Sequence, residues 1–220
     1  MWESFFGFKK TPFSDSPDAK QLFASAAWQQ VKTRLEFLTQ HPGAGLLTGE
    51  VGAGKSTAAR VFTASLNPSL YKILYVHFAT GSALDLLRQI ALALDLEPAH
   101  FRGDLVRQIS DAIVRLQPLL PRTLSLQMHA ALRQRIGVHY HLEGLTREEL
   151  DAYLTQQLKA AGVTQPLFDD TARQGLYQVT KGIPRKVNKL AMTALRLAAE
   201  RKAQMVDEAL LLDATAEALL

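Results

Sequence analysis

The spacing of apolar residues changes along the chain, and each change predicts a different element. Val31, Leu35 and Leu38 recur at helical spacing, and the sequence His-Pro-Gly at residues 41–43 ends that segment. Residues 44–48 form a short apolar run, which predicts a buried parallel strand. The first part of the chain therefore reads as a helix followed by a buried strand.

The middle of the chain alternates between predicted helices and strands. Residues 73–78 read Ile-Leu-Tyr-Val-His-Phe, and such β-branched and aromatic side chains predict a strand. A further strand is expected where Val138, Tyr140 and Leu142 alternate with glycine and histidine. Amphipathic spacing predicts helices over residues 55–66, 82–94, 104–116 and 121–135.

From residue 145 onward the pattern is helical only. Thr146 and Glu149 stand three residues apart and form a capping box at the start of the first helix. Three more helices are predicted after it. The first of them has a cap at Asp169 or Asp170 and stops at Gly182. The second has Pro184 in its first turn, and the third covers residues 206–220. We therefore predict an α/β domain over residues 1–143 and an all-helical domain over residues 144–220.

Composition narrows the class of protein. The 220 residues include no cysteine, which excludes disulfides and thiolate metal sites. No apolar stretch is long enough for a signal peptide or a membrane span, so we expect a soluble, cytoplasmic protein without a membrane partner. The net charge of +4 is compatible with a nucleic acid partner, although many proteins of this charge bind none.

A glycine-rich loop between the predicted strand and helix carries the strongest chemical signal. Residues 49–56 match the phosphate-loop (Walker A) pattern G-x-x-x-x-G-K-[ST] at every fixed position. In such a loop, backbone N–H groups surround phosphate oxygens, the lysine reaches the β- and γ-phosphates, and the last hydroxyl binds Mg²⁺. The chain is therefore expected to bind ATP with Mg²⁺, with Lys55 on the phosphates and Ser56 on the metal. The residues expected around the phosphates are Gly49, Glu50, Val51, Gly52, Ala53, Gly54, Lys55, Ser56 and Thr57.

Three segments together resemble one known family. The opening FFGFKKTPFSDSPDAKQLF, the loop LLTGEVGAGKSTAAR and the later GIPRKVNKLAMTAL are similar to the ExeA-type (general secretion pathway protein A) AAA+ ATPases. That group is related to the ATP-binding helper proteins of transposons and to the origin-recognition ATPases. The resemblance implies a P-loop NTPase fold of the α/β class, with a three-layer core, a reduced parallel sheet and a C-terminal helical lid.

The resemblance also implies roles for residues outside the loop. Arg185 would be the sensor-2 arginine that contacts the γ-phosphate, against the alternative of a surface arginine at a helix start. Arg133 and Arg135 stand where the family has arginines near the subunit interface, so Arg135 is a candidate arginine finger in a homo-oligomer, or else simply solvated. The opening aromatic residues either line an adenine pocket or, as we favour, pack under the first helix.

One catalytic element is missing. A hydrolysing P-loop protein carries an Asp-Glu pair after an apolar strand, the Walker B element, and no such pair lies between Ser56 and Arg135. The pair Asp207-Glu208 reads instead as the start of the last helix. Against the family pattern, the Walker B and sensor-1 strands are deleted near residues 116–117. We therefore expect either a sheet closed up to three strands or a poorly stable protein.

These observations leave several functions open. The favoured one is an ATP-binding AAA+ helper protein in DNA transposition or a related DNA process, with duplex DNA and a transposase as partners. Its support includes basic lid residues such as Lys186, Arg196 and Arg201. The alternatives are a secretion-pathway ATPase of the ExeA type and a nucleotide-binding remnant that does not hydrolyse ATP. A small-molecule P-loop kinase is a further alternative, which we disfavour because the C-terminal part reads as an AAA+ lid. His139 and His141 share one strand face, which we interpret as surface histidines rather than as a metal site.

Overall fold

The protein is described here by a computed structural model, which covers residues 2–14, 22–41, 43–76, 81–116 and 136–218. The chain forms two compact units. The first consists of Met1–Val61 together with Ile136–Leu220, and the second of Phe62–Arg135. The segments before and after the second unit thus fold together into the first.

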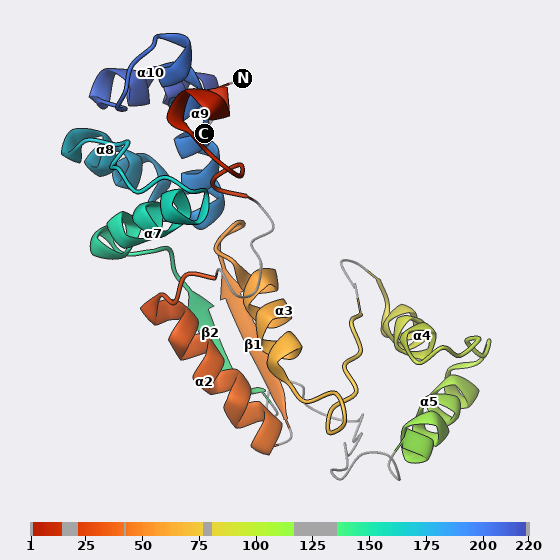
Figure 1. Cartoon of the computed structure of the whole chain (residues 1–220). Helices are drawn as coiled ribbons and strands as arrows, with labels where there is room; N and C mark the ends of the chain where they lie inside the picture. The colour runs from red at the N-terminus through yellow and green to blue at the C-terminus, as the bar shows by residue number, and fades with distance from the viewer. Residues whose placement is uncertain (1, 15–21, 42, 77–80, 117–135, 219–220) are drawn as a thin grey trace. The chain divides into compact units, whose positions relative to one another are not determined.

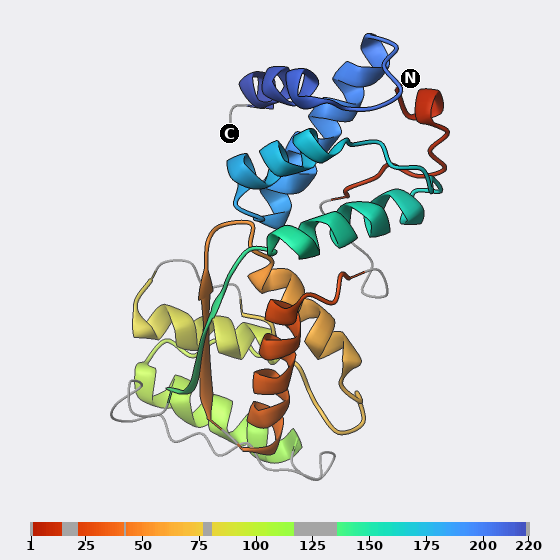
Figure 2. The same cartoon turned by 90° about the vertical axis from the view of Figure 1, so that its left-hand side faces the viewer.

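A two-stranded parallel sheet lies at the base of the first unit (Figure 1). Strand β1 (Ala44–Gly49) pairs with β2 (Ile136–Leu142), so that Leu47 lies opposite Tyr140. Helices α2 (Ala26–Gln40) and α3 (Lys55–Ser65) lie on the same side of the two strands (Figure 2). The parallel strands and the helix after β1 confirm the predicted α/β class.

The sheet differs from the sequence prediction in two ways. Residues 71–76 carry no strand, so within the described residues the sheet has two strands rather than the expected three. The part of the predicted strand at residues 77–78 lies outside the described residues. The prediction of a buried β1 was also wrong, because Leu46 in the middle of this strand is 44% exposed and Gly45 beside it is exposed as well. Strand propensity alone does not supply the neighbour that a strand needs.

Four helices form the lid: α7 (Arg147–Ala160), α8 (Asp170–Thr180), α9 (Pro184–Glu200) and α10 (Glu208–Ala218). The predicted capping box is present at Thr146 and Glu149, and Asp169 rather than Asp170 caps α8. Lys181 ends α8 in the left-handed conformation, and Pro184 occupies the first turn of α9. These local signals give the helix boundaries that the sequence predicts. The side chains of the lid core that are fully buried are Leu150, Leu167, Ala172, Leu176, Val187, Leu190, Ala191, Ala194, Leu195, Ala198, Val206 and Ala214.

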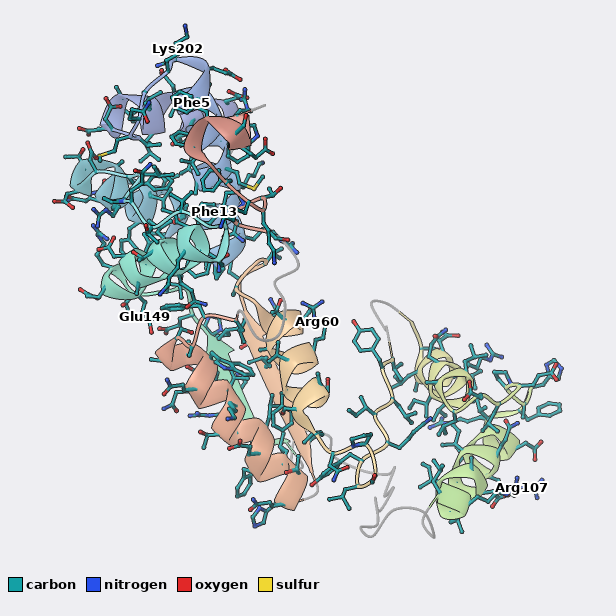
Figure 3. All side chains as sticks on the ribbon, viewed as in Figure 1. Phe5, Phe13, Arg60, Arg107, Glu149 and Lys202 are labelled. Carbon is teal, nitrogen blue, oxygen red and sulfur yellow. The ribbon has the colours of Figure 1, made fainter. Side chains whose placement is uncertain are left out.

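The opening aromatic residues join the lid core. Helix α1 (Trp2–Phe6) lies beside α9, and Phe13, 1% exposed, packs edge-on against Phe168 at 6.5 Å between ring centroids (Figures 1 and 3). The prediction that the aromatics of residues 5–13 pack under the first long helix was therefore wrong. The lid core offers them a larger apolar surface than α2, on which Val31 is the one described residue that is buried.

The second unit contains a pair of helices with its own small core. Helices α4 (Ala83–Ala93) and α5 (Arg102–Leu116) confirm two predicted segments. They bury Leu87, Ala91, Leu105 and Ile109. The predicted helix over residues 121–135, with Arg133 and Arg135, lies outside the described residues. None of the described helices has the length and apolar character needed to cross a bilayer.

Candidate nucleotide-binding site

The loop between β1 and α3 has the backbone that the glycine-rich pattern requires. Strand β1 ends at Gly49 and α3 begins at Lys55. Gly52 and Gly54 have φ angles of +90° and +100°, which side-chain-bearing residues rarely adopt. The Ala53 N–H donates to the Glu50 carbonyl at 3.1 Å and so closes the turn. The predicted strand–loop–helix arrangement is therefore confirmed.

The Lys55 ammonium folds back over this loop. Its Nζ donates to the carbonyl oxygens of Gly49 and Glu50, at 2.9 Å each. Both acceptors are neutral, so the positive charge is hydrogen-bonded but not neutralised by these contacts. A phosphate oxygen would be a stronger, charged acceptor for the same ammonium. Lys55 and the N-terminus of α3 together fit an anionic group at this loop.

A cavity of about 290 Å³ adjoins the loop, close to the lower end of the range for small-ligand pockets. Its walls come from the N-terminal segment, the loop with the start of α3, the end of β2, and the lid helices α7 and α9. The residues that line it are Ser14, Leu22, Phe23, Ser25, Trp28, Val51, Gly52, Ala53, Gly54, Lys55, Ser56, Thr57, Ala58, Leu142, Glu143, Leu145, Tyr153, Gln157, Pro184, Arg185 and Asn188. Seven of the nine predicted loop residues are in this lining, and Gly49 and Glu50 contribute their carbonyls beneath Lys55.

The start of α9 touches the loop directly. Arg185 lines the cavity, and its backbone N–H points to the Gly52 carbonyl at 3.4 Å. A Cβ at Gly52 would lie 2.7 Å from the Cβ of Arg185, so the loop needs glycine there for contact with the lid as well as for its φ angle. Beside Arg185, the Lys186 ammonium forms an ion pair with the Glu50 carboxylate at 2.5 Å. The structure thus brings together Lys55 and Arg185, two cations that the sequence separates widely.

The connection from β2 into the lid is made of closely packed backbone. The Leu145 N–H donates to the Gly182 carbonyl at 2.9 Å. A Cβ added at Gly144 would lie 2.4 Å from the Lys181 carbonyl oxygen, and one added at Gly182 would lie 2.0 Å from the Leu145 carbonyl oxygen. Gly182 also has a φ of +70°. These two glycines allow α7 and the α8–α9 turn to meet directly above the end of β2.

Aromatic and amide side chains form the wall away from the loop. The rings of Phe23 and Tyr153 meet edge to face at 5.7 Å, and the Tyr153 hydroxyl donates to Asn188 Oδ1 at 2.7 Å. Gln157 adds a second amide to this wall. The combination provides apolar surface and hydrogen-bonding groups for a flat heteroaromatic ring. These residues could not be predicted from the sequence, because they come from separate segments without a shared motif.

The acidic lining of the cavity is sparse. Among the described residues, Glu143 is the one carboxylate in the lining, directly after β2, and Ser56 lines the same cavity. A hydroxyl and a carboxylate are oxygen ligands of the kind that Mg²⁺ accepts, so the donor set fits that ion. Glu143 could have been found from the sequence, because it follows the predicted strand and parallel strands end at one edge of a sheet. Asp207 accepts the Leu210 N–H at 2.9 Å and caps α10, as predicted for the start of a helix.

The histidine pair has no metal-site geometry. Thr48 Oγ1 lies 3.1 Å from His141 Nδ1 and 3.4 Å from His139 Nε2, so both rings lie on the same face of the sheet, as predicted. Within the part of the chain that the structure describes, no cluster of three or more His, Asp or Glu side chains could hold a metal ion. Arg133 and Arg135, the candidate arginine fingers, lie outside the described residues.

Sequence comparisons identify similar proteins. Residues 38–206 match a family model described as an AAA domain. The chain is 29% identical over 243 residues to general secretion pathway protein A of Aeromonas hydrophila. That match covers 89% of this chain but 44% of the relative, so the chain spans less than half the length of that protein.

Two solved structures share the fold. The Aeropyrum pernix Orc1 protein in complex with DNA superposes with a TM-score of 0.59 at 18% identity, covering 93% of this chain and 66% of that one. The Thermotoga maritima RuvB Holliday junction branch migration motor gives a TM-score of 0.52 at 18% identity, covering 87% of this chain and 68% of that one. At this identity the likeness concerns the fold.

Proposed function

This chain belongs to the AAA domain family and, within it, to the AAA+ ATPases of the ExeA-like group, and from that premise we propose that it binds ATP with Mg²⁺ in the cavity beside the phosphate loop. The observation that carries the proposal is one cavity lined by the phosphate loop, Arg185 of the lid and the Phe23–Tyr153 wall. In this assignment the loop N–H groups and Lys55 hold the phosphates, Ser56 holds Mg²⁺, and Arg185 contacts the γ-phosphate. The base lies against the aromatic wall.

We further propose that the protein acts as a nucleotide-dependent switch rather than as a hydrolytic motor. Hydrolysis needs an acid that orients or polarises the attacking water. The sequence has no Asp or Glu between Asp111 and Glu143, so the acidic pair that normally follows a sheet strand is absent there. Glu143 supplies one carboxylate at the cavity in place of the pair. Bound Mg²⁺ would neutralise charge on the phosphates, and Arg185 would couple the γ-phosphate to the lid.

Two measurements on the purified chain test this proposal. Titration calorimetry with ATP and Mg²⁺ should show one site, and Lys55→Ala should weaken binding by roughly 10- to 100-fold, the effect of losing charge-assisted hydrogen bonds. Phosphate release, with and without duplex DNA, should not exceed that of Lys55→Ala. Turnover above this blank would contradict the switch, and Glu143→Gln would then show whether Glu143 replaces the missing pair. Equal ATP binding by both proteins would contradict the nucleotide site itself.

For the cellular setting we propose a DNA process, with transposition as the specific case. Support comes from the net charge of +4 and from two structural neighbours, an Orc1 protein in complex with DNA and a Holliday junction branch migration motor. The basic lid residues give this proposal little support, because some of their charges are already paired. Arg196 forms ion pairs with Glu200 and Glu217, and Arg201 forms one with Asp213. Binding to duplex DNA that weakens steeply with added salt would support this setting. Absence of DNA binding at low salt would favour the secretion role named for the Aeromonas relative.

Assembly and cytoplasmic location are part of the same proposal. We expect a homo-oligomer in which Arg135 of one subunit reaches the nucleotide of the next. Light scattering with and without ATP tests the assembly. If Arg135→Ala leaves both the assembly and the ATP affinity unchanged, Arg135 is not an interface residue.

A further inference from the structure

We propose that Glu50 and Lys186 form a latch that positions Arg185 over the phosphates, which makes both of them positioning residues for recognition of the γ-phosphate. This inference rests on the proposed function, in which Arg185 contacts that phosphate. It adds a role for the variable second position of the glycine-rich loop, where the phosphate-loop pattern itself requires no particular side chain. It also adds a role for the lysine that follows Arg185.

The latch joins two parts of the chain that are far apart in sequence. Lys186 Nζ lies 2.5 Å from Glu50 Oε1, across 136 residues. Glu50 is part of the loop itself, and its carbonyl accepts from the Lys55 ammonium at 2.9 Å. The same residue therefore contacts a loop cation through its backbone and a lid cation through its side chain. Any rotation of the lid away from the loop has to break the ion pair.

Few other polar contacts join the start of α9 to the loop. Ile183, at the N-cap position, makes no side-chain capping hydrogen bond, and Pro184 has no N–H to donate. The one backbone hydrogen bond from this turn to the loop, Arg185 N–H to the Gly52 carbonyl, is long at 3.4 Å. The Glu50 carboxylate near the first turn also has the favourable charge for a helix N-terminus. The ion pair is therefore the strongest polar contact that the described residues provide at this point.

The helical geometry links the ion pair to Arg185. Lys186 directly follows Arg185 in the first turn of α9, so an ion pair between Lys186 and Glu50 holds the turn that carries Arg185 close to the loop. With Lys186 held at Glu50, Arg185 lines the cavity together with Lys55 and Ser56. Without the pair, one contact fewer holds the lid against the loop, so Arg185 at the start of α9 spends less time close to the phosphates. ATP should then lose more affinity than ADP, because ADP has no γ-phosphate to contact.

The expected effect is modest because the pair is partly exposed. The side chains of Lys186 and Glu50 are 38% and 52% accessible, so water and salt screen their attraction. Measured exposed ion pairs correspond to a change of about 2- to 5-fold in an equilibrium constant. We expect Lys186→Ala and Glu50→Gln each to reduce the preference for ATP over ADP by that factor. The loss should shrink as salt is added.

The experiment measures the dissociation constants of ATP and ADP, both with Mg²⁺, for matched variants of the full chain. Lys189→Ala is the control, because it removes a lysine from an exposed position of the same helix for which the described contacts include no ion pair. Arg185→Ala gives the size of the effect when the sensing side chain is removed. The reversed pair, Glu50→Lys with Lys186→Glu, should recover the preference that either single reversal loses. Thermal unfolding of each variant checks that the lid still folds.

The outcomes distinguish a failure of the latch from a failure of the proposed function. If Arg185→Ala lowers the preference for ATP and Lys186→Ala does not, the latch is wrong while the proposed function stands. If Lys186→Ala weakens ATP and ADP equally and Glu50→Gln strengthens both, Lys186 binds phosphate directly and the latch is also wrong. If wild-type protein binds neither nucleotide, or if Arg185→Ala leaves the preference unchanged, the proposed function fails at that point and the inference fails with it.

Discussion

The helical lid and the sheet layer of the same unit are stabilised to very different degrees. The lid, formed by α7–α10, has one continuous core in which most side chains are fully buried. The sheet layer, formed by β1, β2, α2 and α3, has a core of five buried residues, none of them fully buried: Val31, Ala53, Ala58, Leu142 and Ile183. Ile183 lies directly before α9, so the lid supplies part of this small core. The phosphate loop therefore belongs to the less stable layer and depends on the lid for its packing.

This difference teaches where the predicted loss of two central strands would have its effect. Removing strands from a parallel sheet removes buried area from the sheet layer alone, and the lid core does not depend on them. We infer that bound nucleotide and the lid contacts together stabilise the loop, because a ligand that binds only the folded state adds to its stability.

The largest predicted effect tests the contrast between the two layers. Leu190 on α9 is fully buried in the lid core, whereas Leu46 on β1 is 44% exposed. Leu190→Ala should lower the free energy of unfolding by about 2–5 kcal/mol, through lost burial and the cavity left behind. Leu46→Ala should lower it by less than about 1 kcal/mol. Urea unfolding followed by circular dichroism measures both. Similar losses for the two variants would show that the layers are equally stabilised.

The next effect concerns the carboxylate that joins the layers. Glu149 caps α7 through Oε2, which accepts the Thr146 N–H at 3.0 Å, and its Oε1 accepts the Ala26 N–H at 2.7 Å at the start of α2 (Figure 3). Glu149→Ala should lower the free energy of unfolding by about 2 kcal/mol, because it removes both the α7 cap and the hydrogen bond to Ala26. Thr146→Ala, which disturbs the α7 cap only, should cost about 1 kcal/mol. If the two variants are equally destabilised, the contact to α2 contributes nothing and the layers are not joined there.

The smallest predicted change in stability concerns a contact within the sheet layer. The Arg34 guanidinium stands over the Tyr140 ring, 4.5 Å from its centroid, and so ties α2 to β2. Arg34→Ala should cost about 0.5–1 kcal/mol, as expected for a partly exposed cation–π contact. Lys32→Ala serves as the matched control, because Lys32 forms an exposed ion pair with Glu36 within the same helix at 3.7 Å. If Lys32→Ala lowers the free energy of unfolding more than Arg34→Ala does, the contact between Arg34 and Tyr140 does not stabilise the sheet layer.

Local signals in the sequence predicted the helices well. Thr146 with Glu149, Asp169 and Pro184 each fixed the start of a lid helix, because capping depends on residues within one turn. The glycine-rich loop was likewise predictable, since its function imposes residue types at fixed spacing. The family was also recognisable from three short segments. The division of the chain at residue 143 and the internal deletion remain predictions.

The predictions that were wrong or missing concern residues whose contacts lie far away in the sequence. The β-branched run at residues 73–76 has strand propensity, but no strand forms there in the described residues because pairing needs a neighbour. Phe13 packs in the lid core some 150 residues further along the chain, which no local pattern indicates. The cavity wall of Phe23, Tyr153 and Asn188 was missed for the same reason. Glu143 was missed although its position after a predicted strand offered a signal.

The contact between Gly144 and Gly182 limits how this protein can evolve. Neither position has room for a methyl group, since an added Cβ would come within 2.4 Å or less of a carbonyl oxygen. Natural or engineered variants that change the angle between lid and sheet must therefore do so through the side chains around the junction. In a library of all single substitutions, these two positions should tolerate almost no replacement. Exposed helical positions such as Lys189 on α9 should accept many.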